Sequence, residues 1–168
     1  MDTIFSDDLK ELVTQSRETA ISLGYDYIST IHFFIADCES KTENSIFKFA
    51  FKNLDEFSKF KQDYTLPKID LLAFINESIP LTKEAENTLR LTASVINQHK
   101  QAIVYPSHFF ISALTNKNSL LSNCFSQDEQ ALEKLILENQ LCKKILGLEK
   151  TSRSCFAYQL KRCKGACV

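Results

Sequence analysis

The sequence has few of the residues that build tight turns: of its 168 residues, three are glycine and three are proline. A β-sandwich or barrel needs many such turns, so this scarcity favours helices. No apolar run approaches the roughly 20 residues that a membrane-spanning helix needs. The first eight residues are acidic and lack the charged-then-apolar layout of a secretory signal. We therefore expect an all-α, cytoplasmic protein.

An internal repeat organises most of the chain. The segment HFFI at residues 32–35 recurs 76 positions later at residues 108–111. Because a fixed offset marks copies of one structural unit, the sequence predicts repeat 1 at about 3–66 and repeat 2 at about 79–138. One copy has too little apolar surface for a stable fold. The two copies are therefore expected to pack against each other around a single core.

Four helices are expected in each copy, because apolar residues recur at three- and four-residue spacing. In the first copy they are expected from the cap Ser6 to the stop Gly24, from Ile31 to about Glu39, from the cap Asn44 to Phe51, and from about Leu54 to Asp63. In the second copy they are expected after the cap Thr82, after residues 105–107, at 120–125 and at about 127–137.

His32 and His108 occupy matching places near the start of the two HFFI helices. A histidine at such a place is typical of a capping or core hydrogen-bonding role, so we interpret both as structural. Ser6 and Thr82 also match across the copies, and each has the hydroxyl that an N-cap needs. These four residues are predicted to form the structural motif of the repeat.

The repeated segments resemble the Clp N-terminal repeat, also called the Clp R domain. The residues that carry the resemblance are Phe5-Ser6, Leu23-Gly24-Tyr25 and Ile28-Ser29-Thr30-Ile31-His32-Phe33-Phe34-Ile35, with their counterparts from Leu81-Thr82 to Val104-Tyr105-Pro106-Ser107-His108-Phe109-Phe110-Ile111. The resemblance covers about residues 3–137. It implies an eight-helix, pseudo-twofold domain of bacterial type that recognises substrates or adaptors for Clp-type AAA+ unfoldases and proteases.

A stand-alone protein-binding module of this kind is the first functional hypothesis. The chain has no G-x-x-x-x-G-K-[ST] phosphate loop and no evident Ser-His-Asp or Cys-His arrangement, so ATPase, peptidase or other enzymatic activity is not expected. A Clp-type unfoldase, its substrates or an adaptor would be the partner. By position, Phe5, Ile79 and Leu81 are the candidate margins of a partner-binding cleft. Phosphoarginine reading, known in some family members, is not expected, because Ile31 and Ser107 replace the acid before the motif histidine.

Charge divides the chain unevenly despite its net charge of −1. Residues 139–168 carry seven Lys or Arg and one acid, a charge of +6, which leaves −7 on the remainder. A basic tail on an acidic body is typical of an interaction tail or a nucleic-acid contact, and it is also compatible with an ordinary solvated terminus.

Six cysteines are present, and four of them crowd into the basic tail. Cys38 and Cys124 lie in predicted helices and are interpreted as small core residues. The tail cysteines are Cys142, Cys155, Cys163 and Cys167, with the spacing C-x12-C-x7-C-x3-C. In a cytoplasmic protein such a cluster favours metal over disulfides. Four thiolates suit zinc or an iron–sulfur cluster.

The cysteine segment resembles a second family. The pattern C-x-x-Y-Q-L-x-x-C-x-G-A-C at residues 155–167 is similar to the four-cysteine region of UvrC-type GIY-YIG excinucleases. The resemblance begins near Asp128. It implies ligation by the four tail cysteines within a DNA-repair nuclease. Lys161, Arg162 and Lys164 could contact phosphate, or could offset the charge of a thiolate cluster.

These features leave three hypotheses for the domains 1–138 and 139–168. In the first, the helical body binds a protein partner and the tail is a small extension. In the alternative, the tail is a nucleic-acid-associated metal or iron–sulfur module, and the body recruits a partner. In the third, the tail is a relic without function.

Overall fold

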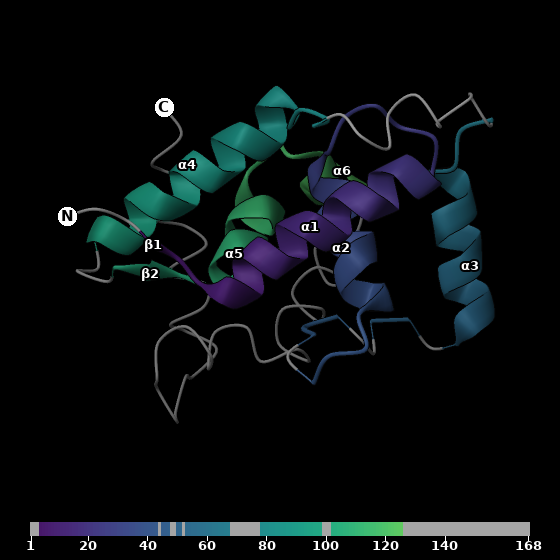
Figure 1. The fold of residues 1–168 in the computed structure, drawn as a ribbon, viewed down its shortest axis with the longest axis horizontal. Helices are drawn as coiled ribbons and strands as arrows, with labels where there is room; N and C mark the ends of the chain where they lie inside the picture. The colour runs from purple at the N-terminus through teal and green to yellow at the C-terminus, as the bar shows by residue number, and fades with distance from the viewer. Residues whose placement is uncertain are drawn as a thin grey trace.

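The computed structural model describes residues 4–43, 45–47, 50–51, 53–67, 78–98 and 102–125. Helices dominate this part of the chain, and Figure 1 shows α3 at one end and the two strands near the other. None of the described helices combines the length and hydrophobicity needed to cross a bilayer. The elements are β1 (Ile4–Phe5), α1 (Asp7–Ser22), α2 (Thr30–Glu39), α3 (Leu54–Asp63), α4 (Lys83–Gln98), β2 (Ile103–Val104), α5 (Pro106–Thr115) and α6 (Leu120–Phe125).

The 76-residue offset relates the bounds of the longer helices. Shifting α1 by 76 residues gives 83–98, the bounds of α4, and shifting α2 gives 106–115, the bounds of α5. Within each half the two helices pack together, α1 on α2 and α4 on α5. The sequence repeat therefore corresponds to a repeat of helix length and helix pairing in the described part of the chain.

Two short parallel strand pairings add to the helices and modify the all-α expectation. β1 pairs with β2, with Phe5 opposite Val104, and an isolated bridge joins Ile28 to Leu81. Each pairing joins one half of the chain to the other. Shifting Phe5 by 76 residues gives Leu81, and shifting Ile28 gives Val104, so the bridge repeats the strand pairing with the two halves exchanged. The hydrogen bonds repeat in the same way: the Ser6 N–H donates to the Val104 carbonyl and the Thr82 N–H donates to the Ile28 carbonyl, both at 2.9 Å.

Phenylalanine rings from both halves form the centre of the core. Phe33 and Phe109, which are counterparts in the repeat, lie with ring centroids 4.5 Å apart. Phe47 packs edge-on against Phe110 at 4.8 Å. These four rings are fully buried, and such ring pairs add to the gain from apolar burial itself. The two halves consequently share one core.

The helix expected from Asn44 to Phe51 is the clearest difference from the sequence analysis. Residues 46–47 and 50–51 form bends, Ser45 has no regular structure, and Asn44 lies outside the described residues. The Asp37 carboxylate accepts the N–H groups of Ile46 at 2.8 Å and Phe47 at 2.7 Å. It thereby satisfies backbone donors that a helix would have used or capped. By contrast, the helices expected at 54–63 and 120–125 are present with those bounds.

Candidate functional site

The four residues of the predicted structural motif lie at helix starts. The Ser6 hydroxyl accepts the Leu9 N–H at 3.2 Å, and the Thr82 hydroxyl accepts the Ala85 N–H at 3.3 Å. His32 Nδ1 accepts the Ser29 N–H at 3.0 Å, and His108 Nδ1 accepts the Tyr105 N–H at 3.1 Å. Each imidazole thus bonds back to the N-cap of its own helix, as a Glu or Gln does in a capping box. The cap of α2 is Ser29, so this helix begins at Thr30, one residue before the expected start at Ile31.

Burial keeps both imidazoles neutral. Desolvation lowers the pKa of His32 to about 4 and also lowers the pKa of His108. A neutral ring is what the capping role needs, because a protonated Nδ1 could not accept the backbone N–H.

These pKa shifts predict an acid-labile fold. Between about pH 6.5 and pH 4 the unfolded chain binds a proton at His32 that the folded chain does not, so stability falls as the pH falls through this window. The pKa shift of His32 alone corresponds to a change of about 3 kcal/mol in the free energy of unfolding. Urea unfolding at pH 7 and pH 4.5 should show most of this loss. The variant His32→Gln, whose side chain can accept the Ser29 N–H but does not titrate, should lose less between the same two pH values. Equal losses in the two proteins would contradict the prediction.

The expected cleft margins differ in exposure. Phe5 is 39% exposed in β1, whereas Ile79 is only 8% exposed and belongs to the core. Leu81 is half-buried and forms the bridge to Ile28. Only Phe5 of the three presents a large part of its side chain to solvent.

A carboxylate junction holds three helices together. Glu84, on the first turn of α4, accepts the Thr30 N–H at 2.8 Å and the Leu120 N–H at 3.2 Å. These are the first residues of α2 and α6, so one carboxylate caps both helices and interacts favourably with both helix dipoles. Its oxygens also accept the hydroxyls of Thr30 at 2.9 Å and Thr82 at 3.0 Å. We call Glu84, Thr30, Thr82 and Leu120 the Glu84 junction.

The Glu84 junction also explains why the described residues 45–47, which correspond to residues 121–123 of α6, are not helical. The Thr30 hydroxyl accepts the Leu121 N–H at 3.1 Å, which caps α6 further. The 76-residue offset places Pro106 at the position of Thr30 and Asp8 at that of Glu84. Proline has neither a hydroxyl nor an N–H, and Asp8 is exposed to solvent. The corresponding segment of the first half therefore lacks these caps.

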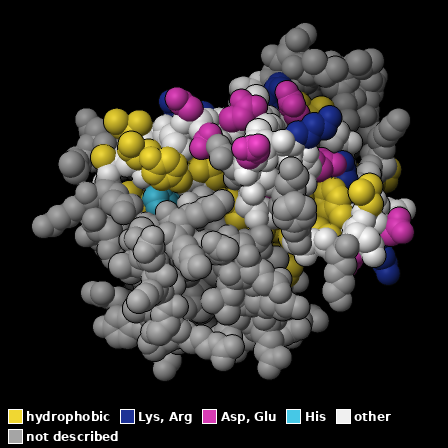
Figure 2. All heavy atoms as spheres, turned by 90° about the horizontal axis from the view of Figure 1, so that it is seen from below, with side chains coloured by type: hydrophobic (Ala, Val, Ile, Leu, Met, Phe, Trp, Pro, Cys, Tyr) yellow, Lys and Arg dark blue, Asp and Glu magenta, His cyan; other side chains and the backbone are white. Residues whose placement is uncertain are grey.

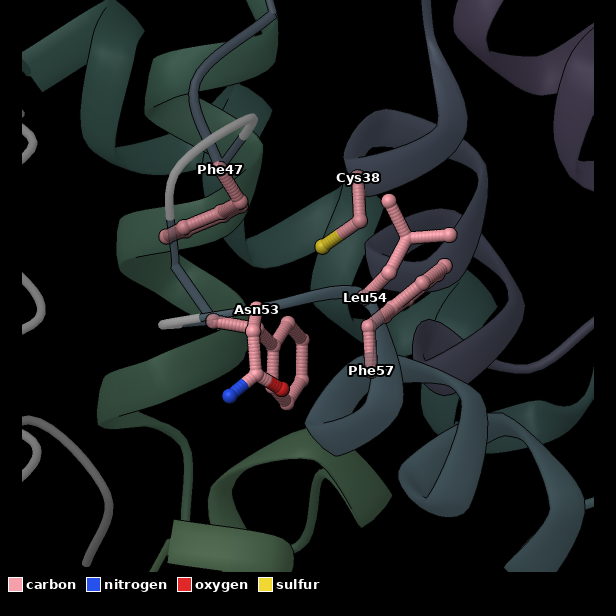
Figure 3. A pocket seen from close by; sticks show the side chains of 6 residues that line it. Cys38, Phe47, Asn53, Leu54 and Phe57 are labelled. Carbon is pink, nitrogen blue, oxygen red and sulfur yellow. The ribbon is translucent and has the colours of Figure 1, made fainter.

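A partly open pocket of about 220 Å³ lies between Cys38 of α2, the described residues Phe47, Phe51 and Asn53, and the start of α3. Figure 3 shows the Cys38 sulfur and the side chains of Phe47, Asn53, Leu54 and Phe57 around it. Burial raises the pKa of the Cys38 thiol, so the thiol is protonated and a poor nucleophile. The Asn53 amide oxygen accepts the Glu56 N–H at 2.8 Å and caps α3. The side chains that line this pocket therefore have packing and capping roles, and none of them is a reactive group.

Cys124 and Tyr64 form a half-buried pair. The Tyr64 hydroxyl and the Cys124 sulfur are 2.8 Å apart. Desolvation raises the pKa of both groups, so both remain protonated near neutral pH. Cys38 and Cys124 are free thiols, and both pack at the margin of the core.

The tail cysteines Cys142, Cys155, Cys163 and Cys167 lie outside the described residues. In the described part of the chain, no group of three or more His, Cys, Asp or Glu side chains could hold a metal ion. Any ligand set therefore has to come from residues whose arrangement is known only through their spacing. Acidic side chains are prominent in the coloured part of the face drawn in Figure 2, so that part does not resemble a phosphate-binding surface.

Comparison with known proteins identifies the class of protein to which part of the chain is similar. Residues 96–168, somewhat less than half of the chain, match the family model of the UvrC/Cho excinuclease middle domain. The match begins near the end of α4, not near Asp128 as expected. It therefore includes α5 and α6 as well as the cysteine-rich tail.

Several curated bacterial proteins that match this chain are named excinuclease cho. The chain is 36% identical over 96 residues to proteins named excinuclease cho from Escherichia coli K12 and Shigella flexneri, and 34% identical to that of Salmonella typhi. Each alignment covers 55% of this chain and 32% of the relative. The chain thus spans about a third of the length of the curated relatives that it matches.

A solved structure, described as "Preliminary structural investigations of a malarial protein secretion system", is similar in fold. It matches with a TM-score of 0.59 over 84% of this chain and 97% of that chain. The sequence identity is 17%, so this likeness shows the fold alone.

These comparisons overturn the first functional hypothesis. The match to the excinuclease middle domain and the relatives named excinuclease cho make the Clp-adaptor interpretation wrong, together with the expected unfoldase partner. The expectation that this chain has no enzymatic activity is also contradicted, because the relatives that it matches in part are named as excinucleases. The resemblance of the cysteine segment to UvrC-type excinucleases is confirmed.

Sequence reasoning missed the Glu84 junction and the strand pairing. Thr30 and Glu84 are 54 positions apart, and no pattern in the sequence links them. The strands are two residues long, too short to show the alternation that indicates a β-strand.

Proposed function

We propose that this chain is a nucleic-acid-associated protein related to the UvrC/Cho excinucleases, in which the basic tail binds DNA and the helical body supports it. The observation that carries the proposal is the family match over residues 96–168, which ends on the cysteine-rich segment. The charge distribution supports it, because the tail carries +6 and the remainder −7. A cytoplasmic location, where a bacterial protein meets DNA, is part of this proposal.

The four tail cysteines are proposed to hold a metal ion or an iron–sulfur cluster. Their chemistry fits, because four thiolates are the donor set of tetrahedral zinc and of iron–sulfur clusters. When bound, such a group would cross-link a short segment that has little apolar surface of its own. Cys142, Cys155, Cys163 and Cys167 would supply the thiolates, and the neighbouring lysines and arginine would meet phosphate.

The body is proposed to be two copies of one helical unit related by a local twofold axis, of the Clp-N type. The matching bounds of α1 with α4 and of α2 with α5 support this, as does the exchange of halves in the two strand pairings. The contact between Phe33 and Phe109 supports it further, because residues near a twofold axis meet their own counterparts. The family match begins inside the second copy. On this view, the first copy completes the core on which the second copy and its tail depend.

Incision of nucleic acid, the activity stated in the name of the relatives, is proposed to require this segment together with a nuclease region. The resemblance to UvrC-type proteins implies that a GIY-YIG domain would supply that region. This chain would contribute the binding of DNA beside the incised strand.

DNA binding with a steep salt dependence is the expected result. If about half of the seven basic tail residues contact phosphate, log K for duplex DNA should fall with log salt at a slope of about −3. The triple variant Lys161→Gln/Arg162→Gln/Lys164→Gln should weaken binding and reduce the magnitude of the slope by up to about 3. Fluorescence anisotropy measured from low to moderate NaCl concentration, roughly 50 to 300 mM, gives both quantities.

The matched control removes the same charge from the body, as Lys59→Gln/Lys83→Gln/Lys117→Gln, three exposed lysines of the described surface. It should leave the slope unchanged. Equal losses in the two triple variants would show that the tail is not the binding element, and no binding at the lowest salt concentration would overturn the proposed function.

A further inference from the structure

Four of the most exposed large apolar side chains gather at the strand pair. Ile4 is 58% exposed, Phe5 39%, Ile103 41% and Tyr105 44%. We call these four residues the strand-pair patch. Figure 2 shows hydrophobic side chains exposed together at one end of the molecule, with acidic side chains close by. A contiguous apolar surface of this kind commonly marks a contact with another polypeptide segment.

The geometry of the strands directs Ile4 and Ile103 toward solvent, whereas Phe5 shares the face of the buried Val104 and is exposed at the margin of that face. Ile4 pairs with Ile103 and Phe5 with Val104, and paired residues of neighbouring strands share a face of the sheet. Val104 is fully buried, so its face is the core side, and Ile4 and Ile103 lie on the solvent side. The sheet has only these two strands among the described elements, so β1 has one edge that pairs with no other described strand. Edge strands of this type readily take up a further segment.

Charge next to the patch favours a basic occupant. Asp7 and Asp8 follow β1 directly, at the first turn of α1, and both are exposed. The Asp7 carboxylate pairs with Lys10 at 2.8 Å, so Asp8 supplies most of the uncompensated charge at this edge. A segment with both apolar and basic side chains would complement this surface.

The tail of the same chain has that composition. Phe156, Tyr158 and Leu160 are followed by Lys161, Arg162 and Lys164. Roughly thirty residues separate the end of α6 from Phe156. Even if the helix expected at about 127–137 rises only about 1.5 Å per residue, the other residues, at up to about 3.3 Å each, give a reach longer than the width of a domain of this size. A tethered segment of this length has an effective local concentration of the order of millimolar, so weak contacts suffice to hold it.

We propose that residues 156–164 dock on the strand-pair patch of their own chain and leave it when the tail binds nucleic acid. The docking itself rests on the patch, the charges and the tether. Its regulatory meaning rests on the proposed function: the acidic body and the DNA phosphates compete for the same basic residues. The apolar contacts and Asp8 would hold the tail on the body until DNA, with its higher charge density, displaces it.

The experiment compares the full-length wild type with a patch variant, Ile4→Ser/Ile103→Ser, and a matched control, Leu54→Ser/Leu120→Ser. Leu54 and Leu120 are 82% and 41% exposed, so each variant removes two exposed aliphatic side chains. The first readout uses no DNA: the rate of trypsin cleavage after Lys161 and Arg162, followed by mass spectrometry. The second readout is the affinity for duplex DNA. Circular dichroism checks that all three proteins are folded.

The patch variant is expected to be cleaved about five-fold faster than wild type, because its apolar docking surface is lost, while the control keeps the wild-type rate. The affinity of the patch variant for DNA should rise about three-fold, because DNA no longer has to compete with the body for the tail. Equal cleavage in all three proteins would overturn the docking. Protection that grows with protein concentration would also overturn it, in favour of docking on a second copy. Faster cleavage without any DNA binding would leave the docking in place and remove the proposed function.

Discussion

Glu84→Ala is expected to lower the free energy of unfolding by about 3 kcal/mol. The Glu84 carboxylate accepts backbone N–H groups from the first residues of α2 and α6, and hydroxyls from Thr30 and Thr82. Removing it deprives the first N–H groups of α2 and α6 of their acceptor, and the Thr30 N–H is buried. Hydrogen bonds to a charged group contribute about 1.5–3 kcal/mol each, and lost caps about 1 kcal/mol. Urea unfolding at pH 7 measures the change.

Glu86 provides the control on the same helix. Its carboxylate is half-exposed and pairs with Arg90 on the helix surface, an arrangement worth less than about 0.5 kcal/mol. Glu86→Ala should therefore be nearly neutral. Glu84→Gln, which keeps one acceptor oxygen, should fall between the two. If Glu84→Ala and Glu86→Ala cost the same, the Glu84 junction does not hold the helices together.

Phe109→Ala is expected to cost about 4 kcal/mol, the usual range for deleting a fully buried ring. Phe109 packs on its repeat counterpart Phe33 and also contacts Phe110 with centroids 5.4 Å apart. Little else can fill the space, because Phe33 and Phe110 are themselves fully buried. Chemical denaturation of the variant, with Leu54→Ala as an exposed control, measures the loss.

The pair of rings is suited to a double-mutant cycle. Because the two rings touch, Phe33→Ala and Phe109→Ala should be non-additive, with the double variant costing about 1 kcal/mol less than the sum. Additive losses would indicate that the two rings do not interact and would argue against a shared core between the halves.

The resemblance that predicted the helices did not predict the function. The repeat around HFFI fixes apolar spacing, caps and helix lengths, which are requirements of packing, and these agree with the observed helices. Function depends on particular side chains at a site, and the same fold can carry different sites. The cysteine pattern at residues 155–167 was the more informative functional signal, because it combines spacing with residue identity, and the family match includes it.

Local sequence determined the bounds of α1, α3, α4 and α6, because helix caps and apolar periodicity act within a few residues of each other. It also determined the partition of charge between body and tail, on which the proposed DNA contact depends. The tertiary structure alone decided three things: the strand pairings between the halves, the Glu84 junction, and the loss of helix at residues 45–47. The strand pairings and the Glu84 junction join residues that are far apart in the chain. Helix formation at residues 45–47 depends on whether a distant residue can supply a cap. Thr30 caps α6, and Pro106 at the matching position cannot cap the counterpart segment, so residues 120–125 are helical and the described residues 45–47 are not.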